Sequence, residues 1–258
     1  MKFKSLKFRR QGVLGVLQLH RPAKRNALSD AMVAELDDFF SAPPEGVKAV
    51  VLHGAGEHFC AGLDLAELAN RSAAEGVLHS RGWHRTFEKI QFGRVPVVAV
   101  LHGAVVGGGL ELAACAHLRV AEKNTFYALP EGLRGIFVGG GAAARLPRLI
   151  GVARMADMMF TGRVYSAGEG LACGLSTYLV GAGKGLAKGI ELAAQVAGNA
   201  PATNYALMHA LPRIAELGLE AGLLMESLMA GIAQSEPQAK QRMKDFLAKR
   251  AAKVTRRK

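Results

Sequence analysis

The chain has 258 residues, of which 50% are hydrophobic and 21% are charged, so it can bury a sizeable core and has an ordinary globular composition. No apolar run approaches the ~18 residues that suggest a membrane span, and we expect no membrane association. The formal net charge is +12, but nine basic residues and one aspartate between Pro237 and Lys258 supply +8 of it, which favours a solvated terminus or an anion-binding face over a nucleic-acid partner.

The first predicted elements are two paired strands, over residues 2–10 and 13–19, whose apolar residues alternate. A polar loop over residues 21–29 follows them. Ser29, at the end of this loop, is a suitable N-cap for a helix over residues 30–40.

Two later strands each run into a glycine-rich loop. A strand over residues 47–53 precedes the loop 54–64, and a strand over residues 95–102 precedes three consecutive glycines at 107–109. In an α/β arrangement ligands bind outside the carboxyl ends of the strands, so both loops should face one crevice. The helix start after the glycines leaves backbone N–H groups free for a ligand. Such glycines can also serve only the tight packing of a helix on a strand.

Between these loops, residues 73–92 have helical spacing and carry the single tryptophan, Trp83. Phe87 lies four residues later, on the same helical face. The pair favours ordinary core packing, and the alternative is that it lines a ligand tunnel.

After Gly139 the pattern becomes mostly helical. We expect the α/β core to cover residues 1–198, and a helical part over 199–258 to pack on the core or on a neighbouring subunit. The remaining predicted elements are a strand at 118–121, helices at 139–150, 152–160, 166–172 and 184–198, a strand near 176–180, and helices to about residue 250.

The cysteines and histidines suggest neither a disulfide framework nor a metal site. Cys60, Cys115 and Cys173 are an odd number without ligand spacing, and the eight histidines form no metal-binding motif. We therefore expect a cytoplasmic protein that binds no metal and needs no cofactor of its own.

Two glutamates and two backbone amides form the candidate chemical site. The amides of Ala61 and Gly108, one in each glycine loop, could converge on one oxygen that gains negative charge. Glu111 follows Gly108 by one helical turn, and Glu131 comes 20 residues later. Two carboxylates around one reacting carbon can share acid and base roles when their environments separate their pKa values.

Taken together, these motifs resemble the enoyl-CoA hydratase/isomerase (crotonase) superfamily. The resemblance covers residues 10 to 180 most strongly. It is carried by Arg21-Pro with Asn26-Ala-Leu, Phe59-Cys-Ala-Gly-Leu-Asp64, Gly107-Gly-Gly-Leu-Glu111, Pro130-Glu131 with Gly135-Ile and Gly139, Arg145-Leu-Pro-Arg-Leu-Ile-Gly151, Thr161-Gly-Arg, and Gly170-Leu with Gly174-Leu. Each motif is weak alone, but together and in this order they are specific. The resemblance implies a spiral of repeated ββα units with a helical C-terminal part, assembled as a homotrimer or a dimer of trimers.

The resemblance also implies an acyl-CoA thioester as substrate and assigns roles by position. Ala61 and Gly108 would form the oxyanion hole, Glu111 and Glu131 would be the paired acids, and the amide of Gly139 would help hold the catalytic water. Asp64 is also expected to bond its own turn. The implied substrate and coenzyme A contacts are Lys24, Ala27, Ala61, Gly62, Leu63, Asp64, Leu65, Gly107, Gly108, Phe137 and Lys249.

Two segments depart from the family pattern. Val138 stands where the family usually has proline, and Ala142 replaces a glycine, so Ile136 and Phe137 would lie beside the acyl pocket. Near the C-terminus, residues 234–241 replace the usual acidic, glycine-bearing turn. These differences bear on the preferred acyl chain.

The function favoured by the sequence is hydration of an α,β-unsaturated acyl-CoA. We assign Glu111 as the base on the water side and Glu131 as the proton donor, although a close pair titrates jointly. The alternative of the same class is double-bond isomerisation, in which one carboxylate moves the proton alone. A non-catalytic CoA- or RNA-binding role is the alternative from another class.

Overall fold

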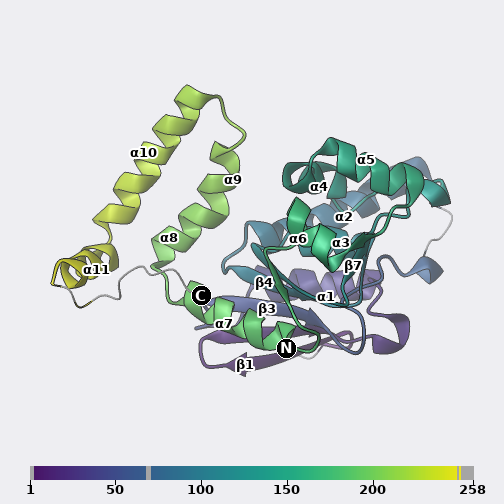
Figure 1. The fold of residues 1–258 in the computed structure, drawn as a ribbon, viewed down its shortest axis with the longest axis horizontal. Coiled ribbons are helices and arrows are strands. Elements are labelled where there is room, and N and C mark those ends of the chain that lie inside the picture. The colour runs from purple at the N-terminus through teal and green to yellow at the C-terminus, as the bar shows by residue number, and fades with distance from the viewer. Residues whose placement is uncertain (1–2, 68–70, 249, 251–258) are drawn as a thin grey trace. The chain divides into compact units, whose positions relative to one another are not determined.

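In this computed structural model residues 3–67, 71–248 and 250 are described, and the chain divides into two compact units, Met1–Ala197 and Gly198–Lys258. This boundary lies one residue from the expected one. The first unit mixes strands and helices, whereas the described part of the second unit is helical (Figure 1). That the second unit packs on the core or on a neighbouring subunit stays a prediction.

The first unit is built on a six-stranded sheet of short, largely apolar strands. The order is β1-β2-β3-β4-β6-β9, in which β1 is antiparallel to β2 and all other neighbours are parallel. The strands are β1 (Leu6–Gln11), β2 (Leu14–Leu19), β3 (Ala49–Gly54), β4 (Val97–Leu101), β6 (Leu118–Glu122) and β9 (Tyr178–Val180). The central strands β3 and β4 are almost entirely buried, as parallel strands covered on both faces require.

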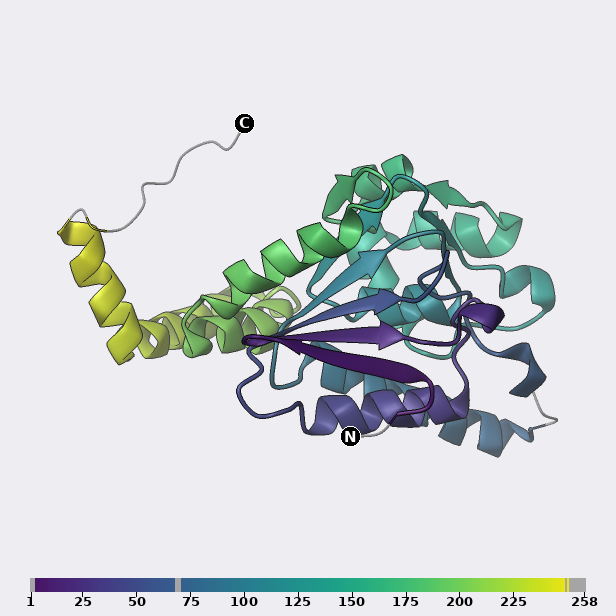
Figure 2. The ribbon, with the colours of Figure 1, turned by 90° about the horizontal axis from the view of Figure 1, so that it is seen from below.

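Helices cover both faces of this sheet (Figure 2). Helix α7 (Gly185–Ala197) lies on one face, where Leu192 and Ala193 pack with the valines of β3 and β4. On the opposite face are α1 (Asp30–Ser41), which Ser29 caps as expected, and α2 (Ala73–Gln91). The two central strands are therefore shielded from water, and loops at their carboxyl ends carry the polar residues.

A second, three-stranded sheet of order β5-β7-β8 stands beyond these carboxyl ends. Its strands have only two or three residues each, and the sequence analysis did not predict them because so short a segment shows no periodicity. The strands are β5 (Ala104–Val106), β7 (Phe126–Ala128) and β8 (Tyr165–Ser166). The helices around them are α3 (Gly108–Ala114), α4 (Ala142–Ile150), α5 (Val152–Thr161) and α6 (Ala167–Cys173), with short 3₁₀ turns η1 (Pro22–Lys24), η2 (Leu65–Glu67) and η3 (Gly132–Arg134).

The second unit consists, in its described part, of α8 (Pro201–Tyr205), the π-helical η4 (Ala206–Ala210), α9 (Leu211–Ile214), α10 (Leu219–Ser235) and α11 (Pro237–Leu247). Few of its side chains are buried within the unit, and α10 buries only Gly222. None of the helices in the described ranges combines the length and the apolar character that a membrane crossing demands.

Candidate active site

The two glycine loops meet at the start of helix α3. Gly62 has a φ of +101°, and a Cβ on it would lie 2.9 Å from the carbonyl oxygen of Val106 and 3.5 Å from the Gly108 nitrogen. A Cβ on Gly109 would lie closer still to the carbonyl oxygen of Cys60. Only glycine permits this approach, so the sequence itself brings the loop 54–64 onto the helix start.

The free amides at this junction are those of Gly108 and Leu63. The Gly108 N–H opens α3 and has no partner within the helix, and neither amide donates to any group in the described part of the chain. A Cβ on Gly108 would lie 3.4 Å from the Leu63 nitrogen, so the two donors are neighbours.

The predicted donor Ala61 does not fit this arrangement. Its N–H donates to the carbonyl oxygen of Arg25 at 3.0 Å, because residues 60–64 run beside the loop before α1. After the turn at Gly62 the amide of Asp64 donates to Leu28, and the amide of Leu63 between them is left free. The motif indicates Leu63 only as a substrate contact, since a motif does not reveal which amide a turn leaves free.

Glu111 is buried on the first turn of α3, with 3% of the residue exposed. Its Oε1 accepts hydrogen bonds from the amides of Gly140 at 2.8 Å and Ala142 at 2.9 Å. Burial raises the pKa of Glu111 to about 7, against the lowering effect of these two amides, and the nearby charge of Glu131 raises it further. A carboxyl group with this pKa can exchange a proton near neutral pH.

Glu131 stands just before η3 and faces the same junction. A Cβ on Gly107 would lie 2.5 Å from Glu131 Oε1, so the glycine makes room for the carboxyl group. Glu131 Oε2 is buried without a hydrogen-bond partner among the described residues. Burial also raises the pKa of Glu131 above its usual value. An unpartnered buried carboxyl oxygen is costly, which indicates a place for a reacting molecule.

Gly139, predicted to help hold water, lies in the loop that joins η3 to α4. Its N–H donates to no group within residues 3–67, 71–248 and 250, while its carbonyl oxygen accepts from Ser80 Oγ at 2.6 Å. No motif pointed to Ser80, because its partner lies 59 residues away in sequence.

The remaining predicted contacts are placed around this junction with different exposures. Asp64 accepts from the Ala66 amide of its own turn at 3.3 Å and pairs with Arg21 at 2.8 Å, and the Arg21 hydrogen bond lowers the pKa of Asp64. Ala27 is buried, Lys24 and Leu65 are exposed, and the side chain of Phe137 is exposed rather than enclosed in a wall. Lys249 lies outside the described residues.

Trp83 and Phe87 lie behind the glycines that surround Glu111. Both are buried, with ring centroids 5.6 Å apart. A Cβ on Gly108 would lie 3.0 Å from the Trp83 ring, and a Cβ on Gly140 would lie 3.1 Å from the Phe87 ring. The rings are therefore core residues, as the spacing favoured, and they also back the site.

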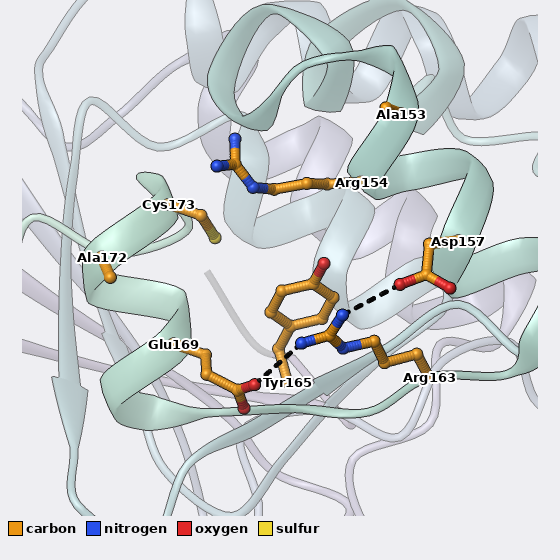
Figure 3. Close-up of a pocket in the computed structure, with 8 residues that line it drawn as sticks. All are labelled: Ala153, Arg154, Asp157, Arg163, Tyr165, Glu169, Ala172 and Cys173. Carbon is orange, nitrogen blue, oxygen red and sulfur yellow. Dashed lines mark hydrogen bonds and ion pairs between the residues drawn. The ribbon is translucent and has the colours of Figure 1, made fainter.

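A separate cavity of about 370 Å³ lies between α5 and α6 (Figure 3). Its charged groups largely pair with one another: Arg163 contacts Asp157 and Glu169 at 3.1 Å each and stacks over Tyr165. None of the predicted site residues lines this cavity. The carboxylate pair and the free amides thus define the candidate active site elsewhere.

Comparisons with known proteins show the family to which this chain belongs. A model of the enoyl-CoA hydratase/isomerase family matches residues 9–257. A protein of Bacillus subtilis (strain 168) named a probable enoyl-CoA hydratase is 34% identical over 92% of this chain and 93% of its own length. The 2,3-dehydroadipyl-CoA hydratase of Escherichia coli (strain K12) is 30% identical over 94% of each chain.

Solved structures with a similar fold come from the same family. A crystal structure from Rhodopseudomonas palustris CGA009, provisionally named an enoyl-CoA hydratase, has a TM-score of 0.93 and 58% identity over 97% of each chain. An enoyl-CoA hydratase of Mycobacterium smegmatis has a TM-score of 0.90 and 28% identity over 97% of this chain and 98% of its own. The expected crotonase-like fold is confirmed. The chain belongs to the enoyl-CoA hydratase/isomerase family.

Proposed function

We propose that the protein is an enoyl-CoA hydratase that adds water across the double bond of a 2-enoyl-CoA thioester. The observation that carries this proposal is the pair of buried glutamates, Glu111 and Glu131, beside two free backbone amides. Hydration needs both a base for the water and an acid for the α-carbon, and two carboxyl groups supply them.

In this mechanism the amides of Gly108 and Leu63 donate to the thioester oxygen. Negative charge collects on that oxygen as the water oxygen adds to the β-carbon, and two fixed donors stabilise this charge. The role that the sequence assigned to Ala61 passes to Leu63, because the Ala61 amide is occupied by Arg25.

The hydrogen bonds distinguish the two carboxyl groups. Glu111 Oε1 is held by two amides, which favour the ionised form and leave Oε2 to take a proton from water. Glu131 Oε2 receives no donor, which suits a protonated group that delivers its proton to the α-carbon. The free Gly139 amide is well placed in the same loop to bind the water. The O–H bond of water and the π bond of the alkene break as one C–O and one C–H bond form. Glu111 is then protonated and Glu131 ionised, so a proton must return from Glu111 to Glu131 before the next turnover.

We also propose that the protein acts as a homotrimer or a dimer of trimers. The support is the apolar surface that the other residues of the second unit leave uncovered: Leu219, Leu223, Leu224, Leu228 and Ile232 of α10 are all more than half exposed, between 53% and 80%. A patch of this kind marks an interface in a protein that stays in solution. The free thiols Cys60, Cys115 and Cys173 are compatible with a reducing compartment such as the cytoplasm.

The test is the loss of the enoyl-thioester absorbance when the protein is mixed with 2-enoyl-CoA substrates of increasing chain length, including dicarboxylic and aromatic ones. We expect turnover with at least one of them and formation of the 3-hydroxyacyl-CoA. Conversion of 3-enoyl-CoA to 2-enoyl-CoA without hydration would instead identify an isomerase.

A further inference from the structure

One peptide group connects the hydroxyl of Ser80 to the carboxylate of Glu111. Ser80 Oγ donates to the Gly139 carbonyl oxygen at 2.6 Å, and the N–H of the same peptide unit, that of Gly140, donates to Glu111 Oε1 at 2.8 Å. Because the peptide is planar and rigid, fixing its oxygen also fixes the direction of its N–H. A donor at the oxygen further polarises the N–H and strengthens its bond to the carboxylate.

The glycine loop that holds Glu111 is positioned by side chains that lie outside it. A Cβ on Gly140 would lie 2.7 Å from Glu111 Oε2, so this position must stay without a side chain. The loop is instead held from outside, by Ser80 at the Gly139 oxygen and by Arg145 Nη1 at the Gly140 oxygen, 3.3 Å away. Arg145 is itself bound through Nε to Gln91 Oε1 at 2.7 Å, so both supports lead back to α2.

Ser80 does not make the bond that a serine inside a helix usually makes. Such a hydroxyl commonly donates back to the carbonyl four residues earlier or points to solvent. The Ser80 hydroxyl instead reaches a loop 59 residues away and is itself 3.4 Å from His84 Nε2, which can donate to it.

We propose that Ser80 is a positioning residue for Glu111: its hydroxyl holds the Gly139–Gly140 peptide so that the Gly140 amide keeps the carboxylate in place as the water-side base. The role of Glu111 in this statement rests on the proposed hydratase function. The hydrogen-bonded geometry does not, and it is measurable without turnover.

The proposal predicts the direction in which the pKa of Glu111 changes when Ser80 is replaced. Burial raises the pKa of Glu111 to about 7, and the Gly140 and Ala142 amides oppose that rise. Weakening one amide should therefore raise the pKa further. The other titratable or charged groups near Glu111 are Glu131 ahead of η3, Arg145 on α4 and Cys115 just after α3. His84 on α2 lies across the loop, near Gly141, and hydrogen-bonds the Gly139 backbone. Ser80→Ala changes none of these charges.

The experiment compares the full chain with Ser80→Ala, with Ser80→Thr, which keeps a hydroxyl, and with Thr86→Val. Thr86 is a matched control because its hydroxyl, on the same helix, bonds Asp37 on α1 instead of the loop. Carboxyl ¹³C NMR titration follows Glu111, assigned by the signal lost in Glu111→Gln. We expect the pKa of Glu111 to rise by about half a unit in Ser80→Ala only.

Kinetics supply the second measurement. We expect kcat for hydration to fall roughly five- to tenfold in Ser80→Ala, the scale of one hydrogen bond, while KM stays within about twofold and Ser80→Thr recovers most of the loss. In a Glu111→Gln background Ser80→Ala should cause no further loss.

A folded Ser80→Ala protein with an unchanged Glu111 titration would overturn the proposal, as would an equal loss of kcat in the Glu111→Gln background. If Ser80→Ala does not fold, Ser80→Cys, with a similar volume and a weak donor, takes its place under the same criteria. A shifted titration in a protein that hydrates no enoyl-CoA would support the positioning role and contradict the hydratase function.

Discussion

At the scale of single residues, the site depends on two carboxyl groups kept from water. The raised pKa of Glu111 follows from burial and would be higher without the amides of Gly140 and Ala142. Burial also raises the pKa of Glu131, whose Oε2 accepts no hydrogen bond from the described residues. Glu111 therefore titrates near neutral pH, and the pKa of Glu131 is shifted in the same direction.

The raised pKa of Glu111 should show in the pH dependence of activity. A base must be ionised, so kcat/KM should fall as pH drops below about 7, the pKa of Glu111.

The stability of the protein should also depend on pH. Because the pKa of Glu111 is higher in the folded state than in the unfolded state, the folded state binds the proton more tightly, and stability should decline as pH rises between about 4.5 and about 7. Glu111→Gln should remove a penalty on the order of 3 kcal/mol at pH 8 and little at pH 4. Urea unfolding at both pH values measures it, and equal effects at both would contradict the shift.

Gly107 gives a second prediction at this scale. It has a φ of +50°, and a Cβ there would lie 2.5 Å from Glu131 Oε1. Gly107→Ala should therefore displace the carboxyl group and lower kcat about 10²-fold, the low end for one lost proton transfer. Gly12→Ala is the control, since Gly12 has a φ of +60° but nothing within 4 Å of its Cβ position. The prediction holds if both variants lose similar stability but only Gly107→Ala loses kcat. Equal kcat values in the two variants would contradict it.

At the scale of elements, sequence patterns predicted the long segments well and the short ones poorly. The helices expected over residues 30–40 and 73–92 from apolar spacing are confirmed as α1 and α2. Ser29 caps α1 as predicted, whereas the cap of α2 by Ser72 was not predicted. The strands β5, β7 and β8 are too short to show a pattern, yet β5 leads into the glycines at 107–109, β7 precedes Glu131, and β8 pairs with β7.

The site shows the same division. The motifs named the two glutamates and Gly108, because these chemical groups lie in characteristic glycine contexts. They misplaced the second amide at Ala61, because which N–H is free depends on the neighbouring loop at Arg25 and on the turn at Gly62. Ser80 was missed because only the folded chain brings α2 to the Gly139 loop.

Replacing single amides by esters decides between Leu63 and Ala61. An α-hydroxy acid at position 63 removes the free N–H and should lower kcat roughly 10²–10³-fold, the usual effect of one oxyanion donor. The same replacement at position 61 removes an N–H bonded to Arg25 and should chiefly lower stability. Circular dichroism controls for folding in both. A large kcat loss at position 61 and none at 63 would restore the original assignment.

At the scale of the whole molecule, the α/β unit contains every described residue of the proposed site, and the helical unit leaves apolar surface uncovered. Leu224 and Leu228 of α10 are 63% and 61% exposed. If this surface is the interface, Leu224→Asp with Leu228→Asp should shift the protein to monomers in light scattering coupled to size exclusion. Glu220→Lys with Glu226→Lys, exposed charges of the same helix, is the control. An unchanged mass after both leucine substitutions would place the interface elsewhere.

The most direct measurement of the central claim, that both glutamates transfer protons during hydration, uses Glu111→Gln, Glu131→Gln and the double variant. Each substitution keeps the shape and removes the titrating group, so each should lower kcat for hydration of 2-enoyl-CoA by ~10²–10⁴ while thioester binding persists. The double variant should lose far less than the product of the two single losses, because the carboxyl groups act on one reaction as a unit. Isomerisation of 3-enoyl-CoA is followed in parallel with all three. Full hydration activity in Glu111→Gln would contradict the two-carboxylate mechanism and leave Glu131 acting alone.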